Sequence, residues 1–268
     1  MIPIICFTSD FGLEDSWVGV CHATIYRATP QVRVVDLAHQ IEPYDIRKGA
    51  FVAASGVWQL PKAIHLVAVD PGVGGGRHDV VLVTGAGSCL VGPDNGVLML
   101  ATWRAGGVAE AYAIDPRALR PRPPLATFHA RDVLAPAAAT LASGVDASAL
   151  GEPIDPDGLI PAPFTPTVGE GDTISTEVLD VDRFGSVRMG ISSADVEELG
   201  VKGLGLELSV GQVSLSVPFG ATFSDVGRGE PVAVVDSSGW LTLAVREGHA
   251  SERFGIETGM VVSVRRTT

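Results

Sequence analysis

The stretch His65–Arg77 reads HLVAVDPGVGGGR, an apolar run that ends on an aspartate and turns through Pro-Gly into a glycine-rich loop. Nearly continuous apolar runs are typical of strands covered on both faces, as in the parallel sheet of an α/β domain. The run therefore predicts a buried strand with Asp70 at its carboxyl end. Because glycines allow sharp turns, we expect the loop to bring Arg77 back to Asp70 as an ion pair, either in an active site or with a purely structural role.

Other parts of the N-terminal half repeat this pattern. Residues 2–8, 32–38, 80–85 and 89–92 are short apolar runs, and residues 17–25 carry apolar side chains at helical spacing. Alternating strands and helices predict an α/β fold with a mainly parallel sheet, which we assign to an N-terminal domain at residues 1–160. The continuous apolar runs place its strands inside the domain.

The C-terminal half reads differently. Prolines recur from 152 to 171 and disfavour helices and central strands, which predicts a linker at 161–169. Residues 174–247 then hold short alternating strands between glycine-rich turns, with one helical pattern at 193–200. We therefore expect a smaller all-β, barrel-like domain at residues 170–268.

Composition excludes several classes of protein. The formal net charge is -12 and no Lys/Arg cluster occurs, which argues against nucleic acid as a partner. The three cysteines are far apart, so neither a disulfide framework nor a thiolate zinc site is expected. No apolar run approaches the roughly 20 residues that span a bilayer, and the first residues lack a signal-peptide pattern. A cytoplasmic protein without membrane contact is predicted.

Candidate functional residues follow the strands. Asp10 comes directly after the first strand, in TSDFG, where its carboxylate can accept two ribose hydroxyls or cap the next helix. His129, in TFHARDVL, is open to three interpretations: a core histidine, a metal ligand with Asp132, or a general base. No metal site is predicted because the acidic residues and histidines of these segments form no HxxxH, HxH or HExxH pattern. The glycine loop also matches neither GxGxxG nor GxxxxGK[ST].

Two turns of the C-terminal half combine carboxylates, hydroxyls and aromatic rings. They read DRFGS at 182–186 and DSSGW at 236–240. Both are typical hairpin turns, and both can also hold an amino-acid head group.

Taken in order, TSDFG, VDLAHQIEPYDI, VAVDPGVGGGR, GPDNG, TFHARDVLAPAAA, DRFGS and DSSGWLTLAV resemble the S-adenosylmethionine hydroxide adenosyltransferase family, relatives of the fluorinase and chlorinase. The resemblance implies that water displaces L-methionine from the 5′ carbon of S-adenosylmethionine and gives adenosine. It implies no metal or redox cofactor. It also implies a homotrimer whose sites lie between the N-terminal domain of one subunit and the C-terminal domain of the next.

The resemblance also assigns residues by position. Asp70, Arg77 and His129 match the family's water-handling triad, and sequence alone does not say whether Asp70 or His129 is the base. Asp10 matches a ribose-diol carboxylate, Tyr44 a residue stacking near the sugar and adenine, and Phe128 a wall of the site. The remaining implied substrate contacts are Asp182 for the methionine ammonium group, Ser237 for its carboxylate, Phe184 and Phe223 for adenine, and Ser186 and Ala250 at two positions where family motifs contact adenine.

Some positions depart from the family. The usual DRFGN reads DRFGS here, with Ser186 for the asparagine, and the usual AVNxGNA reads AVREGHA, ending at Ala250. In the halogenases, tyrosines stand at the positions of Asp70 and His129. The residue after His129, usually glycine in the hydrolases and serine in the fluorinase, is alanine here. A hydrolase is therefore expected, with a chlorinase and a non-catalytic adenosine or S-adenosylmethionine binding module as the alternatives.

Overall fold

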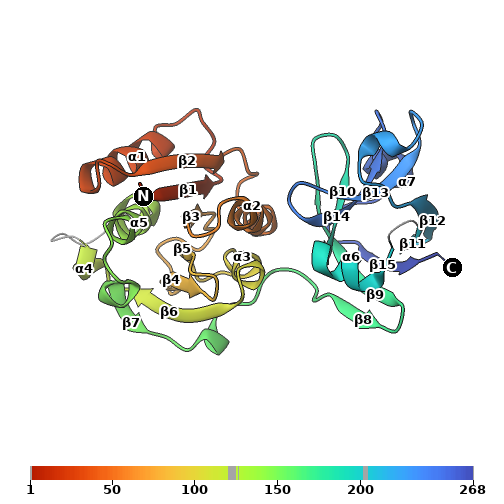
Figure 1. The fold of residues 1–268 in the computed structure, drawn as a ribbon. Helices are drawn as coiled ribbons and strands as arrows, with labels where there is room; N and C mark the ends of the chain where they lie inside the picture. The colour runs from red at the N-terminus through yellow and green to blue at the C-terminus, as the bar shows by residue number, and fades with distance from the viewer. Residues whose placement is uncertain (1, 120–124, 126, 202–204, 268) are drawn as a thin grey trace. The chain divides into compact units, whose positions relative to one another are not determined.

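The computed structural model describes residues 2–119, 125, 127–201 and 205–267 of the 268-residue chain. These residues form two compact units, Met1–Pro163 and Phe164–Thr268 (Figure 1). Unit 1 is an α/β domain and unit 2 is a barrel-like β domain, so the predicted fold class is confirmed. Among the described residues, no helix combines the length and the apolar character needed to cross a membrane.

Unit 1 contains, in chain order, β1 (Ile4–Ser9), α1 (Trp17–Ala28), β2 (Arg33–Ala38), α2 (Ile46–Gln59), β3 (Ile64–Ala68), β4 (Asp79–Thr84), β5 (Cys89–Pro93), α3 (Met99–Arg104), β6 (Val108–Ile114), α4 (Pro116–Leu119), the π-helix η1 (Ala130–Leu134), α5 (Ala135–Ala142), the 3₁₀ helix η2 (Ala147–Leu150), β7 (Gly151–Pro153) and the 3₁₀ helix η3 (Pro156–Gly158).

The sheet of unit 1 has seven strands in the order β2-β1-β3-β5-β4-β6-β7. Strands β2, β1, β3 and β5 pair in parallel, whereas β4, β6 and β7 extend the sheet antiparallel. Helices α1 and α5 pack against each other on one face, and α2 and α3 form a second helical pair (Figure 1). All five residues of β3 are buried, which explains why four of them, all except His65, are apolar. The parallel strands thus supply the rigid centre of the unit.

Unit 2 contains, in chain order, β8 (Val168–Glu170), β9 (Thr173–Val181), β10 (Val187–Ser192), α6 (Ser193–Leu199), β11 (Gly205–Val210), β12 (Val213–Pro218), the 3₁₀ helix η4 (Phe223–Asp225), β13 (Pro231–Val235), β14 (Trp240–Val245), α7 (Ala250–Phe254) and β15 (Val261–Arg266).

The strands of unit 2 pair antiparallel in the order β12-β11-β15-β9-β10-β14-β13, with β8 added beside β9. A bridge between Phe219, just after β12, and Ala233 in β13 joins the two ends of this order and nearly closes the sheet. The predicted helix at 193–200 is α6, which begins with a capping box between Ser192 and Asp195 and ends at Gly200 in the left-handed region. Apolar side chains from β9 to β15 fill the main core of the unit, whereas β8 is exposed.

His65 is a titratable group inside the core of unit 1. The ring lies on β3 with 1% exposure, and its Nε2 lies 3.3 Å from the carbonyl oxygen of Leu60. Burial lowers the pKa of His65 from 6.5 to about 4, although the hydrogen bond to Leu60 opposes the shift. The unfolded chain therefore takes up a proton at higher pH than the folded protein does.

We expect this difference to cost about 3 kcal/mol of stability in acid. The contribution of His65 is fully present above its unfolded pKa of 6.5 and is lost as pH falls to about 4. In His65→Gln, which cannot titrate, urea unfolding free energies should fall less steeply over this range than in the wild type. His78→Gln, at an exposed histidine, is the matched control and should follow the wild-type slope. Equal slopes for His65→Gln and wild type would contradict the assignment.

Candidate active site

Two carboxylates lie where neighbouring parallel strands of unit 1 end. Asp10 directly follows β1, and Asp70 lies two residues beyond β3, which pairs with β1 in parallel register. The carboxyl ends of such strands form the crevice in which open α/β sheets bind ligands. The strand order therefore brings together two residues that are 60 positions apart.

The glycine-rich loop returns Arg77 to Asp70, as the sequence predicted. The Nε of Arg77 donates to Asp70 Oδ1 at 3.0 Å, and its Nη2 donates to the other carboxylate oxygen. The backbone N–H of Gly72 adds a hydrogen bond to Asp70 Oδ1 at 3.1 Å. A two-point pair of this kind fixes the carboxylate in both position and orientation.

Asp79 extends this pair into a chain that the sequence analysis missed. It is the first residue of β4, its side chain is buried, and it accepts a hydrogen bond from Nη1 of Arg77. Its second oxygen, Oδ2, lies 2.7 Å from Nδ1 of His129. The order is thus Asp70, Arg77, Asp79 and His129, with one guanidinium between two carboxylates and one carboxylate between arginine and histidine.

The chain of contacts determines which ring nitrogen of His129 can act as a base. An ionised carboxylate only accepts hydrogen bonds, so Nδ1 of His129 carries the proton that is donated to Asp79. Nε2 of the neutral ring then holds the lone pair. Burial lowers the pKa of Arg77, but hydrogen bonds and charge from Asp70 and Asp79 outweigh it and hold that pKa above its ordinary value. The guanidinium stays charged between its partners.

A cavity of about 520 Å³ opens beside these residues. Asp10, Tyr44, Asp70, Phe128 and His129 all line it, which brings five of the predicted site residues together. Arg77 does not line it and instead holds Asp70. Its volume is in the range of sites that enclose small molecules.

Aromatic rings form one wall of this cavity. Phe11 lies edge-on to Phe128 with 5.9 Å between ring centroids, and Trp17 packs against Phe11 at the same separation. The π-helix η1 begins at Ala130, directly after His129, and π-helical turns often occur at functional sites. Phe128 in the wall and His129 are therefore consecutive residues that lead directly into η1.

Asp10 is tied to Tyr44 across the cavity. Its Oδ2 accepts the backbone N–H of Tyr44 at 2.9 Å, and Tyr44 adopts a positive φ of 72°. A non-glycine residue in this region costs energy that the surrounding contacts must offset. The contact with Asp10 helps to hold Tyr44 in that conformation.

Unit 2 has a separate cavity of about 820 Å³. The predicted residues that line it are Asp182, Phe184, Ser186, Phe223 and Ser237. Ala250 does not line it, because its side chain is fully buried in the core at the start of α7. The structure thus divides the predicted residues into two groups, one for each unit.

An arginine and three aspartates form an ion network at the second cavity, and Asp182, Arg188 and Asp236 of this network line it. Arg188 contacts Asp236 at 2.7 Å, Asp180 at 3.0 Å and Asp182 at 3.3 Å. Asp182 Oδ1 also accepts the backbone N–H groups of Phe184 and Ser186, each at 2.9 Å. The wall therefore carries both signs of charge, with Asp182, Asp236 and Glu247 beside Arg188 and Arg246, and can contact both an ammonium and a carboxylate group.

Both units match known families. The SAM hydroxide adenosyltransferase N-terminal domain matches residues 5–151, and the C-terminal domain of the same name matches residues 176–263. Together these domains cover most of the chain, in the order of the two units. The chain belongs to the SAM hydroxide adenosyltransferase family.

Relatives support this membership over nearly full length. An (R)-S-adenosyl-L-methionine hydrolase of Salinispora tropica is 41% identical over 96% of this chain and 95% of its own. One from Thermus thermophilus is 39% identical over 96% of this chain and 98% of its own. A fluorinase of Actinoplanes sp. is 26% identical over 98% of each chain. A crystal structure of a conserved protein from Thermotoga maritima superposes with a TM-score of 0.89 at 33% identity, covering 98% of this chain and 100% of that one.

Proposed function

We propose that this protein hydrolyses S-adenosyl-L-methionine to adenosine and L-methionine. The observation that carries the proposal is the chain of contacts from Asp70 through Arg77 and Asp79 to His129 beside the unit 1 cavity. The relatives at 39–41% identity are hydrolases of the (R) form of this substrate. We extend that stereochemical preference, at the sulfonium centre, to this chain.

In this reaction the oxygen of water bonds to the 5′ carbon while the carbon–sulfur bond breaks. The bonding pair goes to sulfur, which becomes the neutral thioether of methionine, and the water proton goes to a base. The leaving group is already activated by its positive charge, so the reaction needs neither a metal nor a redox cofactor. Holding water in line with carbon and sulfur contributes up to roughly 7–11 kcal/mol in ideal cases, more than the ~10²–10⁴-fold from a general base.

We assign the base to His129 and the orientation of water to Asp70. Both oxygens of Asp70 accept hydrogen bonds from Arg77, which fixes the carboxylate as a hydrogen-bond acceptor for water. Asp79 holds the proton on Nδ1 of His129, so Nε2 is free of a proton and can accept one. Asp79 acts through His129 and is a positioning residue.

The charges of the site favour a sulfonium substrate and water over a halide. Asp10 and Asp70 line the cavity, and Asp79 lies directly behind His129, against the single guanidinium of Arg77. This negative surplus attracts a cation and repels chloride from the position next to Asp70. It supports the hydrolase over the chlorinase.

We place the rest of the substrate by the family resemblance. Asp10 binds the ribose hydroxyls, Tyr44 and Phe128 flank the sugar and adenine, and the unit 2 cavity takes the methionine and adenine groups. Asp182 and Ser237 would bind the methionine ammonium and carboxylate, while Phe184, Phe223 and Ser186 would border adenine. Complete sites then form between subunits of a homotrimer, each built from unit 1 of one subunit and unit 2 of another.

Labelled water tests the reaction directly. Purified protein is incubated with S-adenosylmethionine in H₂¹⁸O, with and without chloride, and the products are separated by chromatography and identified by mass spectrometry. We expect adenosine with ¹⁸O in its 5′ hydroxyl, unlabelled methionine, and consumption of the (R) epimer from a mixture of both. His129→Ala is the control and should lose the product. A 5′-chloro nucleoside would establish the chlorinase instead, and tight binding without turnover would establish the binding module.

Mixing two inactive variants tests the shared sites. His129→Ala disables the unit 1 side and Asp182→Ala the unit 2 side, so each variant alone should be inactive. After co-expression in equal amounts, random assembly of the cyclic trimer pairs two intact sides in about a quarter of the sites, and about a quarter of wild-type activity should return. Activity that stays absent in proven mixed trimers would show that both sides come from one chain.

A further inference from the structure

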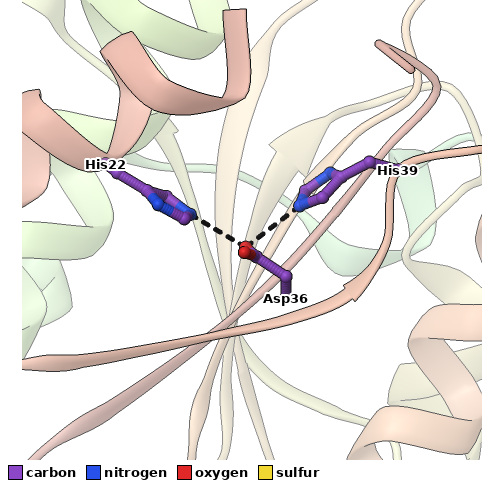
Figure 2. Close-up of side chains that lie close together, drawn as sticks. All are labelled: His22, Asp36 and His39. Atoms are coloured by element: carbon purple, nitrogen blue, oxygen red, sulfur yellow. Dashed lines mark hydrogen bonds and ion pairs between the residues drawn. The ribbon is translucent and has the colours of Figure 1, made fainter. Parts of the chain in front are cut away.

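His22, Asp36 and His39 form a cluster in unit 1 that the proposed reaction does not use. His22 lies on α1, Asp36 on the edge strand β2, and His39 directly after β2 (Figure 2). Asp36 Oδ1 lies between the two rings, 2.8 Å from Nε2 of His22 and 3.0 Å from Nε2 of His39. One potential ligand atom from each residue lies within 4.8 Å of the other two. Two imidazole nitrogens and a carboxylate oxygen are a set that binds zinc and related divalent metals.

The surrounding residues hold both rings in fixed orientations. The buried ring of Phe7 lies 4.7 Å from the ring of His39 and 6.1 Å from that of His22, measured between centroids. Ser9 Oγ lies 2.7 Å from Nδ1 of His39. Metal-binding histidines characteristically make such a hydrogen bond through the nitrogen that does not bind the metal. His39 therefore already presents Nε2 to the centre of the cluster.

That nitrogen of His39 is buried and poorly partnered. The side chain is only 4% exposed, and Nε2, although close enough to Asp36 for an ion pair, makes no directed hydrogen bond to any described residue. Leaving a buried polar atom without a hydrogen bond is unfavourable. A cation seated between the three side chains would take the lone pair of this nitrogen.

The charge and access of Asp36 also suit a cation. The carboxylate is 42% exposed and the His22 side chain 24% exposed, so the cluster is open to solvent on one side. A water molecule can reach a fourth coordination position from there.

We propose that His22, Asp36 and His39 bind one divalent transition-metal ion of the zinc class. None of the three lines the unit 1 cavity, so the ion is not part of the proposed reaction. Its position is linked to that cavity through the backbone. His39 O accepts the N–H of Gly12 at 2.7 Å, and Ser9 directly precedes Asp10. The bound ion would therefore brace the segment that carries Asp10 and join α1 to β2.

Titration of the chelator-treated protein with Zn²⁺, and separately with Co²⁺, tests the site. We expect one equivalent of either ion to bind, a Co²⁺ spectrum of nitrogen and oxygen ligation, and a higher melting temperature with Zn²⁺. Mg²⁺, which prefers all-oxygen sites, should give no such stabilisation. Asp36→Asn and His22→Asn should each weaken Zn²⁺ binding by at least about tenfold, since changes to residues behind the ligands alone cost about 10–100-fold.

His249→Asn is the matched control, because His249 is a half-exposed histidine beside Glu252 in unit 2 and belongs to no such cluster among the described residues. It should bind Zn²⁺ as the wild type does. Anomalous diffraction from wild-type crystals grown with Zn²⁺ covers the case in which a variant fails to fold, and a peak between the three side chains supports the proposal. It is overturned if the wild type takes up no ion, or if the ion binds elsewhere and both cluster variants bind it unchanged.

Discussion

Asp79→Asn should lower kcat by about 10²–10⁴-fold, the usual contribution of a general base, with a much smaller change in KM. The buried carboxylate of Asp79 accepts a hydrogen bond from Nδ1–H of His129, with 2.7 Å between Nδ1 and Oδ2. An amide of the same shape can instead donate to Nδ1, which moves the ring proton to Nε2 and removes the lone pair that accepts the proton from water. The loss arises from the wrong tautomer rather than from a missing side chain.

The comparison with His129→Ala separates this role from a structural one. If Asp79 acts only through His129, the double variant should be no slower than His129→Ala alone. If the losses in kcat of the two single variants multiply in the double variant, Asp79 does not act only through His129. Asp146→Asn makes the same chemical change at an exposed helix cap and should leave kcat unchanged. Melting temperatures of all variants check that each is folded in the assay.

The parts of this site that follow from local sequence were predictable. The apolar run before Asp70 indicates a buried strand, and glycines before Arg77 allow the return that the structure shows. Residues adjacent to strand ends are confined to one edge of a parallel sheet, which is why Asp10 and Asp70 line the same cavity. The local sequence pattern and the geometry of a parallel sheet were therefore sufficient to place Asp10, Asp70 and Arg77.

The role of Asp79 needed long-range structure. It begins β4, which pairs antiparallel with β5, and only that pairing turns its carboxylate towards a histidine 50 positions later. The run VVLVTG predicted a strand at 80–85. It did not predict whether that strand runs parallel or antiparallel to its neighbours, because a strand covered on both faces has a similar apolar sequence in either direction. The available signal was the His78-Asp79 pair, which directly follows Arg77 in the sequence.

The cluster of His22, Asp36 and His39 was missed for a similar reason. The spacing rules for metal sites apply to ligands on one helix or turn, whereas these residues come from a helix, a strand and the following loop. Ala250 illustrates the opposite limit. Its place in a family motif suggested a substrate contact, but the whole residue is buried in the core of unit 2 and does not line the cavity.

Arg77→Met should destabilise the protein by about 3–5 kcal/mol, a large part of the roughly 5–15 kcal/mol that a domain typically has. The guanidinium pairs with Asp70 and Asp79, whose side chains are 11% and 6% exposed. Methionine fills much of the space but leaves two carboxylates facing each other with little water. Removing one member of a buried ion network is costly because the remaining charges lose their compensation.

Neutralising the partners tests that cause. Combining Arg77→Met with Asp70→Asn and Asp79→Asn removes both stranded charges, so urea unfolding should show much of the lost stability restored although catalysis stays absent. Arg77→Lys should be intermediate, since an ammonium keeps the charge but cannot bind both carboxylates as the planar guanidinium does. If the triple variant is less stable than Arg77→Met alone, the role of Arg77 is packing rather than charge. A restored triple variant would instead show that the two stranded carboxylates cause the instability of Arg77→Met.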